Sequence, residues 1–155
     1  MSVMKVGDVV SGQYGRCFLN IDGRRYDFMM LTNVTLKATK TKSKLRFLGR
    51  ASAANKTTGV EITGSCEYYY CTSLMARKVV ELIKTGKDFY FDMQIINKDP
   101  NSSVEEQVAI AKDCNIDSAV LAKLDVDASD ALKANFDFTA ESADITTEFS
   151  EIPGM

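Results

Sequence analysis

The residue types that most often carry out catalysis or bind metals are scarce in this chain. Histidine, the usual general base and the commonest metal ligand, is missing from all 155 residues. Cys66 and Cys71 form the only close pair of cysteines, and no third or fourth ligand follows at a spacing typical of zinc sites. The sequence therefore predicts neither an enzyme nor a metal or cofactor site.

One acidic segment has the spacing with which a calcium-binding loop begins. Asp125, Asp127 and Ser129 occupy loop positions one, three and five. Position six, which requires glycine for a sharp turn, is Asp130, and position twelve, which requires a bidentate glutamate, is Phe136. We therefore reject a calcium site.

The segment 49–59 contains glycines and a Lys-Thr pair, as phosphate-binding loops do. A phosphate-binding loop needs glycine immediately before the lysine, and this chain has Asn55 before Lys56. The Lys56-Thr57-Thr58-Gly59 segment also differs from the Lys-Thr-Gly of serine acylases, and no Ser-x-x-Lys nucleophile accompanies it. Nucleotide binding and acyl transfer are not expected.

Length and charge limit what kind of protein this is. A chain of 155 residues forms one ordinary domain, 1–155, and a net charge of −2 requires neither nucleic acid nor a membrane surface as partner. The charge is unevenly distributed, because residues 1–50 carry ten Lys or Arg against three acids, while 113–155 carry ten acids and two Lys. Such polarity suits head-to-tail contact between copies, although solvated surfaces acquire similar asymmetry by chance.

The sequence shows no signal peptide and no apolar run long enough to cross a bilayer. We therefore expect no membrane anchor and a protein made in the cytoplasm. The four cysteines, at positions 17, 66, 71 and 114, are then expected to be reduced.

Alternating apolar and polar residues predict a mainly β (α+β) fold. About seven antiparallel strands and one helix, 72–86, are expected to form a two-sheet sandwich or barrel covered by the helix. Asp22-Gly23 predicts a tight hairpin turn, and Gly86 is placed to end the helix. Residues 1–13 are expected to be an arm that orders against a partner, and 141–155 an acidic tail without regular structure. The predicted strands are 14–21, 24–31, 32–38, 60–69, 88–97, 108–117 and 134–140.

Cations recur at every second position before the central loop. They are Lys40, Lys42, Lys44 and Arg46, and Arg50 and Lys56 follow in the loop. At that spacing the first four stand on one face of a strand, and such dense charge predicts a hairpin or loop, 37–57, that projects from the core. This face either docks on the acidic half of a neighbouring copy or protects an edge strand from stray pairing, and the two interpretations are compatible.

Short sequence motifs spread through the chain resemble, in order and spacing, those of tail tube proteins from contractile phages and phage-tail-like bacteriocins. The chain differs from the family pattern in 51–55 and in the lysines before Arg46. The motifs are Ser11-Gly12, Gly15-Arg16, Phe18-Leu19, Leu48-Gly49-Arg50, Lys56-Thr57-Thr58-Gly59, Gly64-Ser65, Thr72-Ser73, Tyr90-Phe91-Asp92 with Gln94, Asp99-Pro100, Ser102-Ser103, Leu124-Asp125-Val126-Asp127 and Phe136-Asp137-Phe138-Thr139.

The resemblance implies a non-enzymatic subunit that closes into hexameric rings, which stack into a hollow tube inside a contractile sheath. Its implied partners are further copies of itself, the sheath protein, a baseplate or tube initiator and a tape-measure protein, with DNA as passing cargo in a phage. It also implies assembly in the cytoplasm of a bacterial host, followed by residence in a virion tail or a released phage-tail-like particle.

In such a ring, the polar strand faces would border the channel. The residues predicted to line it are Glu61, Glu67, Asp92, Asp113, Asp117 and Asp137. Acidic side chains there would repel DNA phosphates and let a genome slide, or conduct ions in a bacteriocin.

A different class of protein fits the same composition. A small monomeric β-barrel could bind single-stranded nucleic acid or a protein ligand through basic and aromatic residues. Against this alternative, Tyr68, Tyr69 and Tyr70 are consecutive and not interleaved with cations. An enzyme is the least favoured of the three classes, because the chain has neither a histidine to act as general base nor a nucleophile motif.

Overall fold

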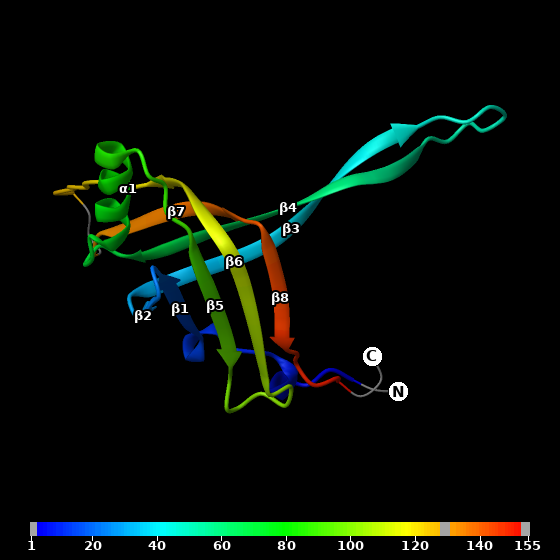
Figure 1. Ribbon diagram of the computed structural model, residues 1–155. Helices are drawn as coiled ribbons and strands as arrows, with labels where there is room; N and C mark the ends of the chain where they lie inside the picture. Colours follow the sequence, from blue (N-terminus) through cyan, green and yellow to red (C-terminus); the bar gives the residue numbers. More distant parts are fainter. Residues whose placement is uncertain (1–2, 128–130, 153–155) are drawn as a thin grey trace.

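The fold is an antiparallel β sandwich with one helix and one long projecting hairpin (Figure 1). It is described by a computed structural model that covers residues 3–127 and 131–152. The strands are β1 (Arg16–Ile21), β2 (Arg24–Asp27), β3 (Leu31–Leu45), β4 (Ala54–Tyr69), β5 (Phe91–Lys98), β6 (Glu106–Ala119), β7 (Lys133–Ala140) and β8 (Ser142–Thr147). The helix is α1 (Leu74–Thr85), and two short 3₁₀ turns, Val6–Asp8 and Gly12–Tyr14, precede β1.

Strand β6 belongs to both layers of the sandwich. Its first half pairs with β5 and β8, and its second half pairs with β7. We call the layer β2-β1-β5-β6-β8 sheet A and the layer β6-β7-β4-β3 sheet B. The outer strands of the continuous path, β2 and β3, are not paired with each other among the described residues. The predicted two-sheet sandwich with one helix is therefore confirmed, and the sheet does not close into a barrel.

A bulge in β6 makes the bend between the two sheets. Asp113 has a positive φ of 53°, and the register with β5 shifts between Met93, which faces Ala111, and Phe91, which faces Cys114. Because the bulge adds one residue, the buried positions are Ala111 and Cys114. Strict alternation of inward and outward side chains along the predicted strand 108–117 is therefore broken near residue 113.

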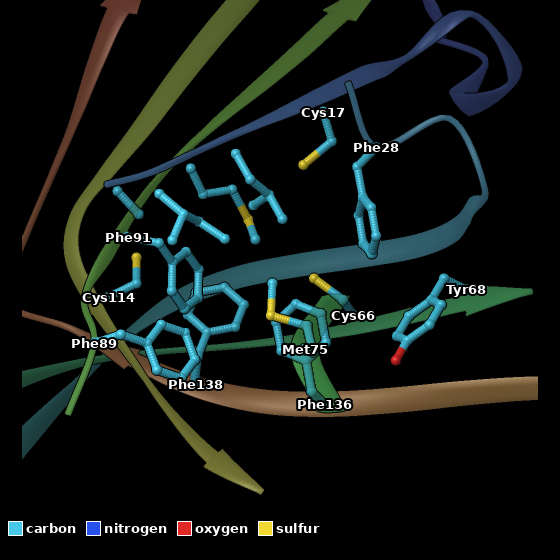
Figure 2. Close-up of a cluster of buried hydrophobic side chains, with 14 of the residues drawn as sticks. Cys17, Phe28, Cys66, Tyr68, Met75, Phe89, Phe91, Cys114, Phe136 and Phe138 are labelled. Atoms are coloured by element: carbon cyan, nitrogen blue, oxygen red, sulfur yellow. The ribbon is translucent and has the colours of Figure 1, made fainter. Parts of the chain in front are cut away.

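The core lies between the sheets and is largely aromatic (Figure 2). The rings of Phe91, Phe136 and Phe138 pack with centroids 5.8–6.3 Å apart, within the range of favourable aromatic pairs. Met75, from the first turn of α1, is 1 % exposed and reaches the same cluster. The helix thus covers one end of the sandwich.

Helix α1 ends with a recognisable cap, whereas its N-cap residue, Ser73, makes no side-chain cap hydrogen bond. Just before the helix, the N–H of Leu74 donates a hydrogen bond to Thr72 Oγ1. At the other end, Gly86 adopts a left-handed φ of 73° with its N–H bonded to the Leu82 carbonyl. The apolar side faces the core through Met75, whereas Ile83 stays 69 % exposed. With only 12 residues, α1 is not long enough to span a membrane, and neither is any other helix in the described part of the chain.

The long hairpin is formed by β3 and β4, which pair from Leu31 and Tyr68 out to Leu45 and Ala54. Strand β7 accompanies β4 only from Tyr69 to Ile62. Beyond Ile62 the two strands continue alone as a ribbon that leaves the sandwich (Figure 1). Of the segment expected to project, 37–57, residues 39–57 lie in this ribbon, whereas Lys37 and Ala38 are still in sheet B opposite Thr63 and Ile62. Residues 54–59, expected in a loop, belong to β4 instead.

The C-terminal segment differs from the sequence-based expectation. The segment 141–155 was predicted to lack regular structure, but it contains β8, which pairs with β6. All six residues of β8 are exposed, so no burial period marked it in the sequence.

Part of the N-terminal arm is attached to its own chain. Gly7, Asp8 and Ser11 are hydrogen-bonded to the turn after β5. The Ser103 N–H donates to the Gly7 carbonyl at 2.8 Å, the Ser103 hydroxyl to Asp8 Oδ1 at 2.6 Å, and the Ser11 N–H to Asp99 Oδ2 at 2.9 Å. Ordering of the arm against a partner stays a prediction.

Candidate assembly surfaces

Sheet B has one apolar and one polar face. Cys66, Tyr68, Phe136 and Phe138 point into the core, and the residues between them point outward. Strand register brings the outward residues into rows across the sheet. The rows are Asn33, Glu67 and Asn135; Thr35, Ser65 and Asp137; and Lys37, Thr63 and Thr139.

Four of the six acids predicted to line a channel lie on this polar face. Glu61, Glu67 and Asp137 alternate with the buried positions of β4 and β7. Asp117 joins Asp137 around a shallow depression of about 340 Å³, which Lys37 also lines.

The polar face also carries cations that the sequence analysis did not place there. Lys133 Nζ lies 3.6 Å from Glu67 Oε1, and Lys37 borders the depression with Asp117 and Asp137. Only the strand register could have revealed these neighbours, because they are far apart in the sequence. The polar face of sheet B therefore has mixed charge rather than purely acidic charge.

Asp92 and Asp113 lie away from this face. Asp92 is on β5 in sheet A, and its Oδ1 accepts a hydrogen bond of 3.1 Å from the Asp113 N–H. Asp113 is the bulge residue of β6. These two residues have a local structural role. The bulge leaves the Asp113 N–H without a partner strand, and the Asp92 carboxylate accepts its hydrogen bond instead.

The cations of the ribbon divide between its two faces. Lys40 is opposite Val60, and Lys42 and Lys44 follow on the same face, which continues the inner face of β3. Lys56 is opposite Ser43 on the other face. Arg46 and Arg50 lie in the turn, where Arg50 Nε donates to Ser52 Oγ at 3.3 Å. Within the described residues, none of these six cations forms an ion pair.

Among residues 3–127 and 131–152, both outer edges of sheet B lack a strand partner. Strand β3 pairs on one side only, with β4. The β6 segment from Asn115 to Ala119 likewise has register partners only in β7. Unpaired strand edges carry free N–H and C=O groups that can pair with another chain. These two edges are thus available to other copies.

Three cysteines occupy the core rather than a reactive site. Cys17, Cys66 and Cys114 are all within 2 % of full burial. Burial raises the pKa of the Cys17 and Cys114 thiols to about 12, and it raises the pKa of the Cys66 thiol further. Thiols in such surroundings stay protonated and serve as small apolar side chains.

A sandwich with two open strand edges, a polar face on sheet B and a charged ribbon has the features of a structural subunit. Comparison with known proteins identifies the family. A family model described as phage tail tube protein matches residues 2–146, and the chain belongs to that family. It is therefore a structural tail tube subunit, and not a monomeric binding module.

Two relatives from Bacillus subtilis (strain 168) cover nearly the whole chain. The phage-like element PBSX protein XkdM is 33% identical over 148 residues, which are 96% of this chain and 97% of XkdM. The protein YqbM is 34% identical over 142 residues, which are 92% of this chain and 93% of YqbM.

Solved structures of tail-like assemblies share the fold at low sequence identity. A chain of the anti-feeding prophage baseplate, a sixfold-symmetrised structure, matches with a TM-score of 0.67 and 12% identity over 94% of this chain and 97% of that one. A chain of the sheath–tube complex of an extracellular contractile injection system matches at 0.58 and 10%, over 84% and 87%. The SPP1 tail tube matches at 0.61 and 13%, over 93% and 81%.

Proposed function

We propose that six copies of this chain close into a ring through the open edges of sheet B. Strand β3 of one copy pairs with the 115–119 segment of β6 in the next, so that the sheets join into one continuous cylinder. The two unpaired edges of a single sheet carry this proposal, because lateral pairing gives the backbone groups of both edges strand partners in the neighbouring copies. The anti-feeding prophage structure, which shares the fold, supports sixfold symmetry.

The polar face of sheet B borders the channel of this cylinder. Glu61, Glu67, Asp117 and Asp137 then face the lumen, while the aromatic core faces outward toward sheet A. Lys37 and Lys133 offset part of the acidic charge. The named residues still leave an excess of acids on the channel surface, so it repels DNA phosphates and offers passing DNA no strong binding site.

The rings stack into a tube, and the basic ribbon makes the contact between rings. Lys40, Lys42 and Lys44 lack acidic partners among the described residues of their own chain, so they are available to a neighbour in the next ring. Stacking of this head-to-tail kind gives an open filament, whose length an additional protein such as a tape measure must set. The sheath protein and a baseplate or tube initiator are the other proposed partners, as in the sheath–tube complex that shares the fold.

Electron microscopy of the purified chain tests this function. We expect the purified chain to form rings or hollow rods at high protein concentration. In the bacterium, we expect the tube to assemble in the cytoplasm and then to become part of a tail. Lys40→Glu with Lys44→Glu should leave rings but stop rod growth. The matched control, Lys84→Glu with Lys87→Glu near the end of α1, changes the same charge and should still give rods. A wild-type chain that stays monomeric at millimolar concentration would contradict the proposal.

Labelling of a cysteine on the polar face tests which surface borders the channel. In a Cys71→Ser background, Ser65→Cys places a thiol on the exposed face of β4, and Ile83→Cys places one on α1. In assembled tubes, a maleimide attached to a large polymer should label residue 83 but not residue 65, while both label in unassembled chains. Equal labelling in tubes would remove the polar face from the lumen.

A further inference from the structure

An apolar groove opens where the ribbon leaves the sandwich. The inner faces of the two sheets separate there and leave a space of about 710 Å³. Val34, Leu36, Val60 and Ile62 line it from sheet B, and Ile95 and Ile145 line it from sheet A. Val60 is 61 % exposed and Ile145 is 47 % exposed. The described part of the chain therefore leaves this apolar surface uncovered.

The apolar wall of the groove continues directly into the basic face of the ribbon. Val60 is paired with Lys40, and Lys42 and Lys44 follow on the same face. Asp144 and Glu148 line the groove from the β8 side. A ligand that enters with negative charges must therefore direct them toward the lysines and away from β8.

The same molecule carries a segment of complementary chemistry, which we call the acidic loop, residues 121–127. Leu124 and Val126 are 95 % and 93 % exposed, and they alternate with Asp125 and Asp127. The one cation of the loop, Lys123, donates from Nζ to the Lys133 carbonyl at 2.7 Å, which holds the loop against β7. Exposed apolar side chains between carboxylates match a surface that is apolar at one end and basic at the other.

The acidic loop and the groove lie apart in the molecule. The loop extends beside α1 (Figure 1), whereas the residues that line the groove belong to the base of the ribbon and to the β5, β6 and β8 side. One copy therefore cannot fill its own groove, but it can offer its loop to one neighbour and receive the loop of another. Contacts of this unlike, head-to-tail kind continue without closing, as a growing tube requires.

We propose that the acidic loop of one copy binds in the groove of a copy in the adjacent ring. Leu124 and Val126 enter the apolar groove, and Asp125 and Asp127 face Lys40 and Lys44. This inference rests on the stacking of rings proposed above, and it adds the identity of the surface that the basic ribbon meets.

Disulfide trapping in assembled tubes tests the contact. In a Cys71→Ser background, Leu124→Cys combined with Val60→Cys should give a ladder of linked chains on a non-reducing gel after mild oxidation. Both positions are exposed, and the three remaining cysteines are buried and protonated, so they do not compete. The control pair, Leu124→Cys with Ile83→Cys, should show at least about tenfold less linked product.

A charge exchange gives a second test that does not depend on disulfide geometry. Lys40→Asp with Lys44→Asp should stop rod growth, as should Asp125→Lys with Asp127→Lys. The combination of all four changes should restore rods, because the sign of both partners is reversed. Failure of the combination to restore rods would overturn the contact.

The possible outcomes separate this inference from the proposed function. Tubes that form without the 124–60 link overturn the inference and leave the tube function standing. If Met4→Cys with Val60→Cys gives a ladder of linked chains and Leu124→Cys with Val60→Cys does not, the groove binds the N-terminal segment, and the inference is also overturned. Wild-type chains that form no rings or rods overturn the proposed function itself.

Discussion

Gly64 on β4 lies directly opposite Phe138 on β7, and the phenyl ring covers the position where a side chain of residue 64 would stand. A Cβ atom at residue 64 would overlap the ring, with Cε2 only 2.7 Å away. Phe138 is fully buried as a result. The glycine is thus required by close packing rather than by an unusual φ.

Replacement of Gly64 by alanine should destabilise the unassembled chain. We expect a loss of about 1–3 kcal/mol in the free energy of unfolding, the usual cost of overpacking a core. The measurement is the urea midpoint at constant m value. Gly59→Ala is the matched control on the same strand, because a Cβ atom there meets nothing within 4 Å and the change should cost less than about 0.5 kcal/mol. Equal losses at the two positions would contradict this account of residue 64.

The bulge of β6 should depend in different ways on Asp113 and on Asp92 of the neighbouring strand β5. Asp113 has a φ of 53°, so Asp113→Gly should be neutral or stabilising by up to about 1 kcal/mol, whereas Asp113→Val should cost about 1–3 kcal/mol. Asp92→Ala should cost about 1 kcal/mol, because the Asp113 N–H loses a carboxylate acceptor. Chemical denaturation of the three variants measures these changes. A valine variant as stable as the glycine variant would show that the bulge conformation carries no strain.

The parts of the fold that local rules govern were predicted from sequence. The Asp22-Gly23 turn has positive φ at both residues, as a two-residue hairpin turn requires, and Gly86 ends the helix in the left-handed conformation. Phe136 and Phe138 alternate with exposed residues because one face of β7 packs on the core and the other is the polar face of sheet B. In each case the information lies within a few consecutive residues.

The features that were missed depend on contacts between distant segments. Strand β8 is exposed on both faces, so it has no burial period that a sequence could show. The bulge at Asp113 shifts the inward positions of β6 by one residue, and the sequence around residue 113 contains no signal that predicts a bulge there. Lys133 meets Glu67 only because β7 and β4 are neighbours. The groove at the base of the ribbon exists only once both sheets are in place.

Acid should release the N-terminal turn from the rest of the chain. The hydrogen bonds from the Ser103 hydroxyl and the Lys5 N–H hold the pKa of Asp8 below its ordinary value. A lowered pKa in the folded state means that this attachment is fully present above the ordinary value and is lost as pH falls through the lowered one. NMR signals of Gly7 and Ser103 should therefore move together as the pH falls below the ordinary pKa of an aspartate. In Asp8→Asn these signals should no longer titrate, and an unchanged titration in that variant would assign it to another carboxyl.

Alkali should destabilise the core through its buried thiols. The pKa of Cys17 and that of Cys114 are raised to about 12 by burial, whereas a thiol in the unfolded chain titrates at about 8.5. Between these values the unfolded state has lost a proton that the folded state keeps, so the free energy of unfolding falls as pH rises. Each such thiol contributes a slope of about 1.4 kcal/mol per pH unit. Urea midpoints of the unassembled chain should therefore fall from pH 8.5 to pH 10. Cys114→Ala should be less stable at pH 7, but its stability should fall less steeply with pH, because one buried thiol is gone.

Cys71→Ser is the matched control, because Cys71 is exposed and its replacement should leave the slope unchanged. If Cys114→Ala and wild type lost stability equally over this range, the alkaline effect would have to come from tyrosine or lysine and not from the core cysteines.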